Sequence, residues 1–139
     1  MQIRPFRDDD EPAVVALWRA CGLTRPWNDP HKDIARKRIV QREMFLVGEL
    51  DGRVVATVMA GYDGHRAWMY YLAVAPAHQR QGLGTLLVRR VEEEMLVRGC
   101  PKVSLLVRSA NEQVRAFYRK LGYAQDDSVP LGKRLIPDE

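Results

Sequence analysis

The sequence from Gln79 to Thr85 reads Gln-Arg-Gln-Gly-Leu-Gly-Thr, and it joins a strand-like stretch ending at Val74 to a long helical pattern. Glycines let a backbone approach an oxygen-rich group closely, and the first turn of a helix presents unpaired N–H groups and the positive end of its dipole. Arg80 adds a full positive charge. The segment therefore predicts a phosphate-binding turn; the alternative is that Gly82 and Gly84 only connect two elements.

Two common nucleotide-binding motifs do not match this turn. A dinucleotide fingerprint has a third glycine where Leu87 stands, and a strand ending in an acidic residue about twenty residues later. A nucleoside triphosphate loop needs Gly-Lys followed by Ser or Thr, which the sequence lacks. Both interpretations are weakened, and phosphate binding of another kind is favoured.

The residues on both sides of the turn show regular apolar patterns. The stretch from Trp68 to Val74 is aromatic and β-branched, as is typical of a buried strand. Residues 82–98 are predicted to form a helix that Gly99 ends, with an apolar stripe of Leu83, Leu87, Val91 and Met95. A strand over 102–107 follows, then a helix that Asn111 caps and Gly122 ends, and a last strand near Val129 to Ile136.

The N-terminal half predicts two helices and a hairpin. Acidic residues 8–11 and Pro12 begin the first helix, which Gly22 ends, and its apolar stripe is Val14, Leu17, Trp18 and Cys21. A loop over 24–30 leads to a basic helix over 31–42. Two strand-like runs, 45–50 and 53–60, are joined by Asp51-Gly52, which favours a tight hairpin turn.

This order of elements predicts an α/β fold of the mixed α+β kind, with one mixed sheet and helices on both faces. The length of 139 residues and the 46% apolar content are those of one domain, so residues 1–139 are expected to form a single domain.

The composition limits the class of protein. No apolar stretch is long enough to span a bilayer, the N-terminus lacks the apolar region of a secretory signal, and Cys21 and Cys100 have no metal-ligand spacing. A soluble protein with reduced thiols in the cytoplasm is expected. The net charge of +4 favours an anionic partner, which could be nucleic acid, a membrane surface or a phosphorylated small molecule.

Two motifs in the same order resemble the GNAT superfamily of N-acetyltransferases. Gln79-x-x-Gly82-x-Gly84 is similar to its acyl-CoA signature, and residues 111–123 resemble its Asn-x-x-Ala-x-x-Phe-Tyr-x-Lys-x-Gly-Phe/Tyr pattern, with Val114 in place of the alanine. Residues 25–30, 61–66 and 131–136 also resemble the YpeA-like bacterial branch of that superfamily.

The resemblance implies a mostly antiparallel twisted sheet with a splayed strand pair, and transfer of an acetyl group from acetyl-CoA to a primary amine of a small molecule, protein or peptide, without a metal. The N–H groups of 81–85 would hold the CoA pyrophosphate, and the backbone of 72–74 would pair with the pantetheine arm. The implied acetyl-CoA site consists of Leu72, Ala73, Val74, Gln79, Arg80, Gln81, Gly82, Leu83, Gly84, Thr85, Asn111 and Tyr118.

For the chemistry, the resemblance implies that Tyr118 is the general acid and that a backbone N–H near Val74 binds the oxyanion. Packing is the alternative role for Tyr118, which belongs to the apolar stripe of its helix. Many relatives carry a carboxylate on the central strand, where this chain has Tyr70 and Tyr71. Without a clear base, an α-amine acceptor is favoured because it loses its proton more readily than a lysine.

Other candidate residues are assigned less directly. Glu49, Asp63 and His65 could act as bases through water, or could simply be solvated. Trp27, Asn28 and Tyr70 are hypothesised to shape the acceptor site, and the alternative for Trp27 is an anchor to the core.

Two other classes of function compete with the enzyme. A non-catalytic acyl-CoA sensor would keep the fold and the turn, and the missing carboxylate supports it. A nucleic-acid binder is suggested by Arg36-Lys37-Arg38, but a continuous basic face with base-reading residues is not evident. We expect acetyl-CoA and an amine as partners, a homodimer as an option, and neither nucleic acid nor membrane.

Overall fold

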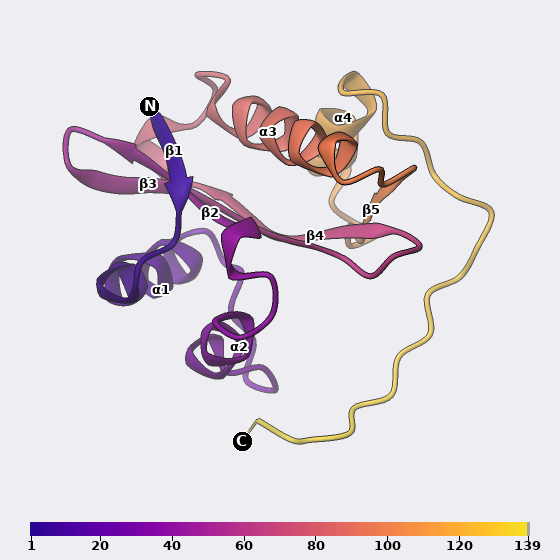
Figure 1. Cartoon of the computed structure of the whole chain (residues 1–139), viewed down its shortest axis with the longest axis horizontal. Helices are drawn as coiled ribbons and strands as arrows, with labels where there is room; N and C mark the ends of the chain where they lie inside the picture. Colours follow the sequence, from indigo (N-terminus) through magenta and orange to yellow (C-terminus); the bar gives the residue numbers. More distant parts are fainter. Residues whose placement is uncertain (139) are drawn as a thin grey trace.

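Five strands form one sheet in sequence order in the structure, a computed structural model that describes residues 1–138 (Figure 1). The pairings among the first four strands are antiparallel, and the last pairing is parallel. The strands are β1 (Gln2–Pro5), β2 (Phe45–Leu50), β3 (Arg53–Tyr62), β4 (Ala67–Val74) and β5 (Val103–Leu105). This is the mixed α/β sheet that the order of sequence patterns predicted.

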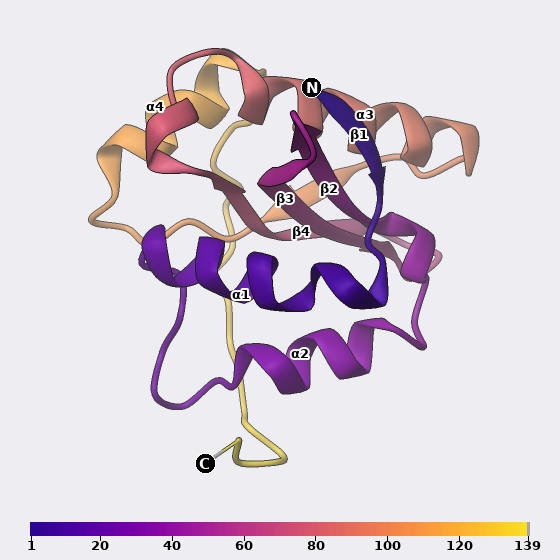
Figure 2. The ribbon, with the colours of Figure 1, turned by 90° about the vertical axis from the view of Figure 1, so that its left-hand side faces the viewer.

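Helices cover both faces of the sheet (Figures 1 and 2). On one face lie α1 (Glu11–Ala20) and α2 (Pro30–Lys37), and on the other lie α3 (Leu83–Val97) and α4 (Glu112–Lys120). Three short 3-10 turns complete the order at Asp8–Asp10, Arg42–Met44 and Pro76–His78.

Each face has its own core. The predicted stripe of α3, Leu83, Leu87, Val91 and Met95, is buried in the cluster on the α3 side. On the other side Val14, Leu17 and Trp18 of α1 pack with Phe45 of β2. Because burying one such side chain contributes about 1.5–3 kcal/mol, these two clusters hold both layers against the sheet.

The hairpin and the helix ends follow the predicted turn chemistry. Leu50 pairs with Arg53, and the two residues between them, Asp51 and Gly52, have φ angles of 51° and 76°. Positive φ at both positions is what a two-residue type I′ turn requires. The Asn111 side chain accepts a hydrogen bond from the Val114 N–H at 3.2 Å and caps α4 as expected.

Two predicted elements were too long, and one strand was not predicted. The strand expected over 102–107 is shortened to Val103–Leu105, and the helix expected over 31–42 ends at Lys37. The basic pattern continues to Arg42, but Ile39 and Val40 are exposed and give no apolar stripe to extend the helix. In addition β1 was missed, because Pro5 is unusual in a strand and is tolerated here on an edge.

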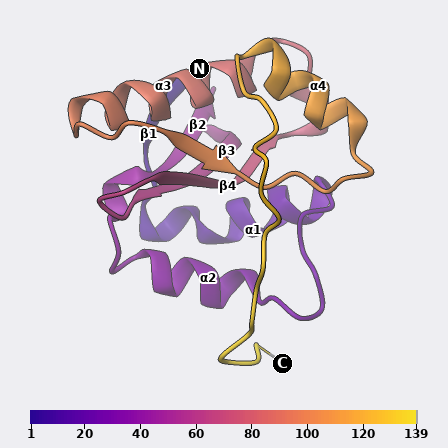
Figure 3. The same ribbon diagram turned by 90° about the vertical axis from the view of Figure 1, so that its right-hand side faces the viewer.

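The last predicted strand, near Val129 to Ile136, does not form. Residues 124–138 contain no helix or strand and run as an extended tail from α4 past the β5 edge toward α2 (Figures 1 and 3). Val129 and Leu131 are 81% and 94% exposed. Apolar residues alternate as in a strand, but the segment pairs with no strand of the described chain, and Pro130 has no N–H to donate.

An ion-pair cluster ties β1 to the first turn before α1. The Arg4 guanidinium donates two hydrogen bonds to the Asp10 carboxylate, at 2.8 and 3.0 Å, and one to Glu49 at 2.8 Å. Arg4 and Asp10 are both buried. Burial alone raises the pKa of the Asp10 carboxyl, but hydrogen bonds from Arg4 and the Arg7 N–H outweigh it, and the net pKa is lowered.

No helix within residues 1–138 is long and apolar enough to cross a membrane.

The Asp10 pKa predicts an acid-dependent loss of stability. Because the pKa of Asp10 is lower in the folded state, its ionised form contributes to the free energy of unfolding. That contribution is complete above the unfolded-state pKa of about 3.9, and it is lost as pH falls through the folded-state pKa. Asp10→Asn should therefore flatten the decrease in unfolding free energy below about pH 4 in urea titrations. The control is Asp9→Asn, an exposed neighbour, and equal acid slopes in the two variants would contradict the role of Asp10.

Candidate functional site

The turn between β4 and α3 has an unusual backbone. Gln79 is extended, Arg80 has a φ of 64° and Gly82 has a φ of 79°. A left-handed conformation is ordinary for glycine and uncommon for arginine, so the turn is held in a specific shape. The fifteen-residue helix α3 begins directly after it at Leu83.

The backbone N–H groups of this turn have no acceptor in the protein. Within residues 1–138, none of the N–H groups from Gln79 to Thr85 donates to a backbone or side-chain oxygen, and the hydrogen-bonded ladder of α3 starts with the Leu86 N–H, which donates to Gly82 O at 3.2 Å. Four N–H groups are left free at any helix start, and here the turn adds more beside Arg80. The geometry therefore fits an anionic group such as a phosphate.

The second sequence motif packs against this turn. A Cβ atom at Gly84 would lie 3.4 Å from Phe117 Cζ and 3.7 Å from Val74 Cγ2, so the glycine brings α3 close to both β4 and α4. The Gln79 side-chain amide donates to the Val74 carbonyl at 3.0 Å, and the Cys21 thiol donates to the same carbonyl at 3.3 Å. The Val74 carbonyl is therefore already occupied.

Strands β4 and β5 separate before the turn. They pair only from Ala67 with Val103 to Met69 with Leu105, whereas β4 continues along β3 as far as Val74. From Tyr70 onward the side of β4 that faces β5 is an open sheet edge. This is the splayed pair that the family resemblance implied.

A bulge at Tyr71 marks the point where the strands part. The register between β3 and β4 shifts there, and Tyr71 has a φ of 54°. The Thr57 hydroxyl donates to the Tyr71 carbonyl at 2.9 Å and accepts from Trp18 Nε1 at 2.9 Å. The Tyr71 ring stacks on Trp18 with their centroids 3.7 Å apart, so the bulge is fixed from the α1 side.

The Tyr71 hydroxyl links β4 to α2 and to the preceding loop. It donates to the Asp33 carboxylate at 2.6 Å and accepts from the Asn28 side-chain amide at 3.0 Å. Burial and then the hydrogen bond to Asp33 raise the pKa of Tyr71, so the phenol stays protonated. Asp33 and Tyr71 were missed as site residues, because only the fold brings α2 to the bulge.

The predicted acceptor residues lie around this network. Asn28 belongs to it, and Tyr70 is half exposed on β4. Trp27 is 53% exposed, so it does not anchor the loop in the core. It lines a pocket of about 620 Å³ together with Arg36 and residues 132–136 of the tail.

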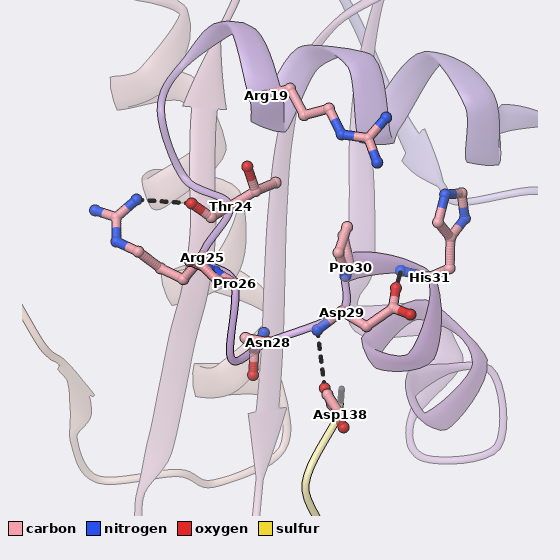
Figure 4. A pocket seen from close by; sticks show the side chains of 9 residues that line it. All are labelled: Arg19, Thr24, Arg25, Pro26, Asn28, Asp29, Pro30, His31 and Asp138. Atoms are coloured by element: carbon pink, nitrogen blue, oxygen red, sulfur yellow. Dashed lines mark hydrogen bonds between the residues drawn. The ribbon is translucent and has the colours of Figure 1, made fainter.

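The tail is anchored by one buried carboxylate. The Asp138 side chain is 0% exposed, and it accepts from Arg36 at 2.7 Å and from the Asp29 N–H at 2.9 Å. Its main-chain carbonyl accepts from Lys32 Nζ at 3.0 Å. The hydrogen bonds from Arg36 and from Asp29 lower the pKa of Asp138. Figure 4 shows the contact between the Asp29 N–H and Asp138 among the residues that line a second pocket, of about 520 Å³. The rest of its lining comes from Arg19 and most of residues 24–31, which are called the 24–31 loop although the last two belong to α2.

Tyr118 projects from α4 into the core on the α3 side and is 8% exposed. It packs edge-on against Phe117 and Tyr123. Burial raises its pKa to about 12. Its hydroxyl has no hydrogen-bond partner within residues 1–138. The hydroxyl oxygen is not fully buried, because Arg38 Nε is the one fully buried side-chain nitrogen or oxygen there that lacks a hydrogen-bond partner.

Among the three proposed bases, Glu49, Asp63 and His65, both carboxylates take part in other interactions. Glu49 is paired with Arg4. Asp63 accepts from the N–H groups of His65 and Arg66 at 2.8 Å each, which closes the turn between β3 and β4. That turn lies at the opposite end of β4 from the glycine turn (Figure 1).

Comparisons with known proteins agree on one family. The profile described as "Acetyltransferase (GNAT) family" matches residues 8–123. An acetyltransferase of Pectobacterium atrosepticum is 49% identical over 138 residues, which cover 99% of this chain and 98% of the relative.

Two solved structures have a similar fold. Ard1 from Thermoplasma volcanium has a TM-score of 0.74 with 25% identity, covering 88% of this chain and 82% of that one. The ribosomal-protein-S18-alanine N-acetyltransferase of Escherichia coli has a TM-score of 0.72 with 26% identity, covering 87% of this chain and 76% of that one.

The Asp138 anchor predicts that the tail orders the 24–31 loop. Asp138→Ala removes the charged acceptor of the Asp29 N–H, so that amide should exchange with solvent about tenfold faster, as expected for loss of a charge-assisted hydrogen bond. Hydrogen exchange read by NMR measures it. The control is Asp127→Ala, an exposed tail residue, and unchanged exchange at Asp29 would refute the anchor.

The buried Tyr118 predicts an alkaline loss of stability. Because the folded-state pKa of Tyr118 is raised to about 12, its protonated form contributes to the free energy of unfolding. That contribution is complete below the unfolded-state pKa of about 10, and it falls by about 1.4 kcal/mol for each pH unit between the two pKa values. Urea titrations should show a shallower alkaline decrease for Tyr118→Phe than for Tyr62→Phe, and matching slopes would contradict it.

Proposed function

The chain belongs to the acetyltransferase (GNAT) family, and from this premise we propose that it acetylates a primary amine with acetyl-CoA bound at the glycine turn. The observation that carries the proposal is the set of N–H groups from Gln79 to Thr85 that have no acceptor within residues 1–138. We further propose that residues 1–139 form one acetyltransferase domain of the YpeA-like branch, on the resemblance of residues 25–30, 61–66 and 131–136.

The proposed acetyl-CoA site runs from the turn along the open edge of β4. The N–H groups of Gln81 to Thr85 hold the pyrophosphate with help from Arg80, and Leu72 to Val74 pair with the pantetheine arm. Because Gln79 and Cys21 already donate to the Val74 carbonyl, the arm pairs with other backbone groups of this edge. Asn111 caps α4 with its side-chain oxygen, which leaves its amide for the arm.

The transfer needs a proton at one place and a free electron pair at another. Acetyl-CoA supplies an acetyl thioester: a C–N bond forms to the amine, the C–S bond breaks, the amine loses a proton and the leaving thiolate gains one. Tyr118 is the proposed proton donor, since a pKa of about 12 keeps its hydroxyl protonated at neutral pH. A backbone N–H near Val74 is the proposed donor to the oxyanion.

The missing base supports an acceptor that deprotonates easily. An α-amine with a pKa near 8 is about half neutral at pH 8, whereas well under one per cent of a lysine with a pKa near 10.4 is neutral. The Escherichia coli relative in structure is named for acetylating an alanine of a ribosomal protein. We therefore favour an α-amine that loses its proton to water before it attacks.

Tyr118→Phe tests the proton donor. It should lower kcat by about 100-fold while KM for acetyl-CoA stays unchanged, because the lost group acts on the leaving thiolate. Initial rates of thiol release measure both constants. Tyr123→Phe, which removes the neighbouring hydroxyl that donates to Glu92, is the control, and an equal fall in kcat for both variants would assign Tyr118 to packing.

Gly82→Ala tests the glycine turn. A Cβ atom at Gly82 or at Gly99 meets nothing within 4 Å, and the φ angles are 79° and 76°, so alanine brings the same backbone strain to either end of α3. That strain costs about 1–2 kcal/mol. Calorimetry should show CoA affinity about tenfold lower for Gly82→Ala and unchanged for Gly99→Ala. CoA that binds both variants like the parent protein would refute the proposed site.

A further inference from the structure

The pocket beside Trp27 combines an aromatic face with positive charge. It has a volume of about 620 Å³ and lies between the 24–31 loop and the tail. The loop contributes Trp27, which is 53% exposed, and α2 contributes Arg36. The tail contributes Lys133, Arg134, Leu135 and Ile136.

Among residues 1–138, the cations that line this pocket outnumber the carboxylates paired with them. Arg36 is compensated by Asp138 at 2.7 Å and by Asp33 at 3.4 Å. Arg134 lies 4.0 Å from the already paired Asp138, and Lys133 has no ion-pair partner within residues 1–138. Two cations of the tail therefore line the pocket with little compensation from the described carboxylates, which favours an anion there.

The pocket connects to the bulge of β4 through a chain of hydrogen bonds. Arg134 donates to the Asn28 side-chain oxygen at 3.2 Å, and the Asn28 amide donates to the Tyr71 hydroxyl at 3.0 Å. Tyr71 sits where the open edge of β4 begins. Figure 3 shows the tail passing the β5 edge, from α4 on one face of the sheet toward the α1–α2 loop on the other.

We propose that this pocket binds an anionic group, a carboxylate or a phosphate, carried by the acceptor amine. The nitrogen of the acceptor then points toward the open edge of β4, and its carbon skeleton lies against Trp27. A pocket with surplus cations disfavours a simple alkylamine, because its protonated form is itself a cation. The acceptor class is thus a small zwitterionic amine. This inference rests on the proposed acetyltransferase function.

Binding of paired probes tests the inference without depending on turnover. The pairs are glycine with glycinamide and O-phosphoethanolamine with ethanolamine. Binding is read from the change in tryptophan fluorescence, and the change is assigned to Trp27 if it disappears in the Trp27→Phe variant. The anionic member of a pair should bind about tenfold more tightly, as expected for one charge-assisted hydrogen bond. The pair with the larger difference in affinity shows whether the pocket prefers a carboxylate or a phosphate.

Charge variants locate the effect. In the double variant Lys133→Gln with Arg134→Gln, the affinities of the two probes in each pair should differ by no more than about twofold. Arg53→Gln is the control, because it removes a positive charge from an exposed arginine at the tip of the β2–β3 hairpin, far from the pocket. A preference that survives the double variant overturns the proposal. So does equal binding within both pairs, or no signal from any probe at about 10 mM.

Calorimetry with CoA and acetylation rates on the same samples separate this inference from the proposed function. Neutral probes that are acetylated as well as anionic ones would leave the acetyltransferase proposal standing and remove the anionic class. Failure of CoA to bind would remove the acetyl-CoA site, while the fluorescence preference is still measured.

Discussion

The bulge at Tyr71 is the constraint on which the other parts of the site depend. One extra residue on β4 turns the strand out of register with β3, and Trp18 and Thr57 hold it there by a stacked ring and two hydrogen bonds. Beyond it β4 no longer pairs with β5, so an open sheet edge runs on to Val74. The same residue aims its hydroxyl at Asp33 and Asn28, which ties the 24–31 loop to the sheet.

The two halves of the site are built by different means. The donor half is a backbone structure: Gly82 permits the turn, α3 orients the N–H groups, and Gly84 allows Phe117 to pack close. The proposed acceptor half is made of side chains from the 24–31 loop, α2, β4 and the tail, held by polar contacts at the surface. In the proposed function, the packed backbone turn binds the cofactor and the polar surface contacts the amine.

The sequence predicted features with local causes, and it did not predict contacts between elements that are far apart in the chain. The glycine turn, the hairpin and the caps of α3 and α4 have local causes, namely residues that favour a given φ or a given cap. The bulge at Tyr71, the partner of Asp33 and the burial of Arg4 depend on which elements meet, and no local pattern carries that information. The tail illustrates the limit: Val129, Leu131 and Leu135 alternate as in a strand, but a pattern does not supply a neighbouring strand.

Within residues 1–138, the middle of the tail is joined by hydrogen bonds to the rest of the protein only at its two ends. Residues 127–133 make no hydrogen bond with any other residue in the described part of the chain, and the anchor at Asp138 lies beyond them. Substitutions or small insertions in that span leave both cores intact, and they alter the wall of the pocket that faces Trp27. Under the proposed function, variation in this span changes the surface offered to the amine, while the two cores and the glycine turn keep their structure.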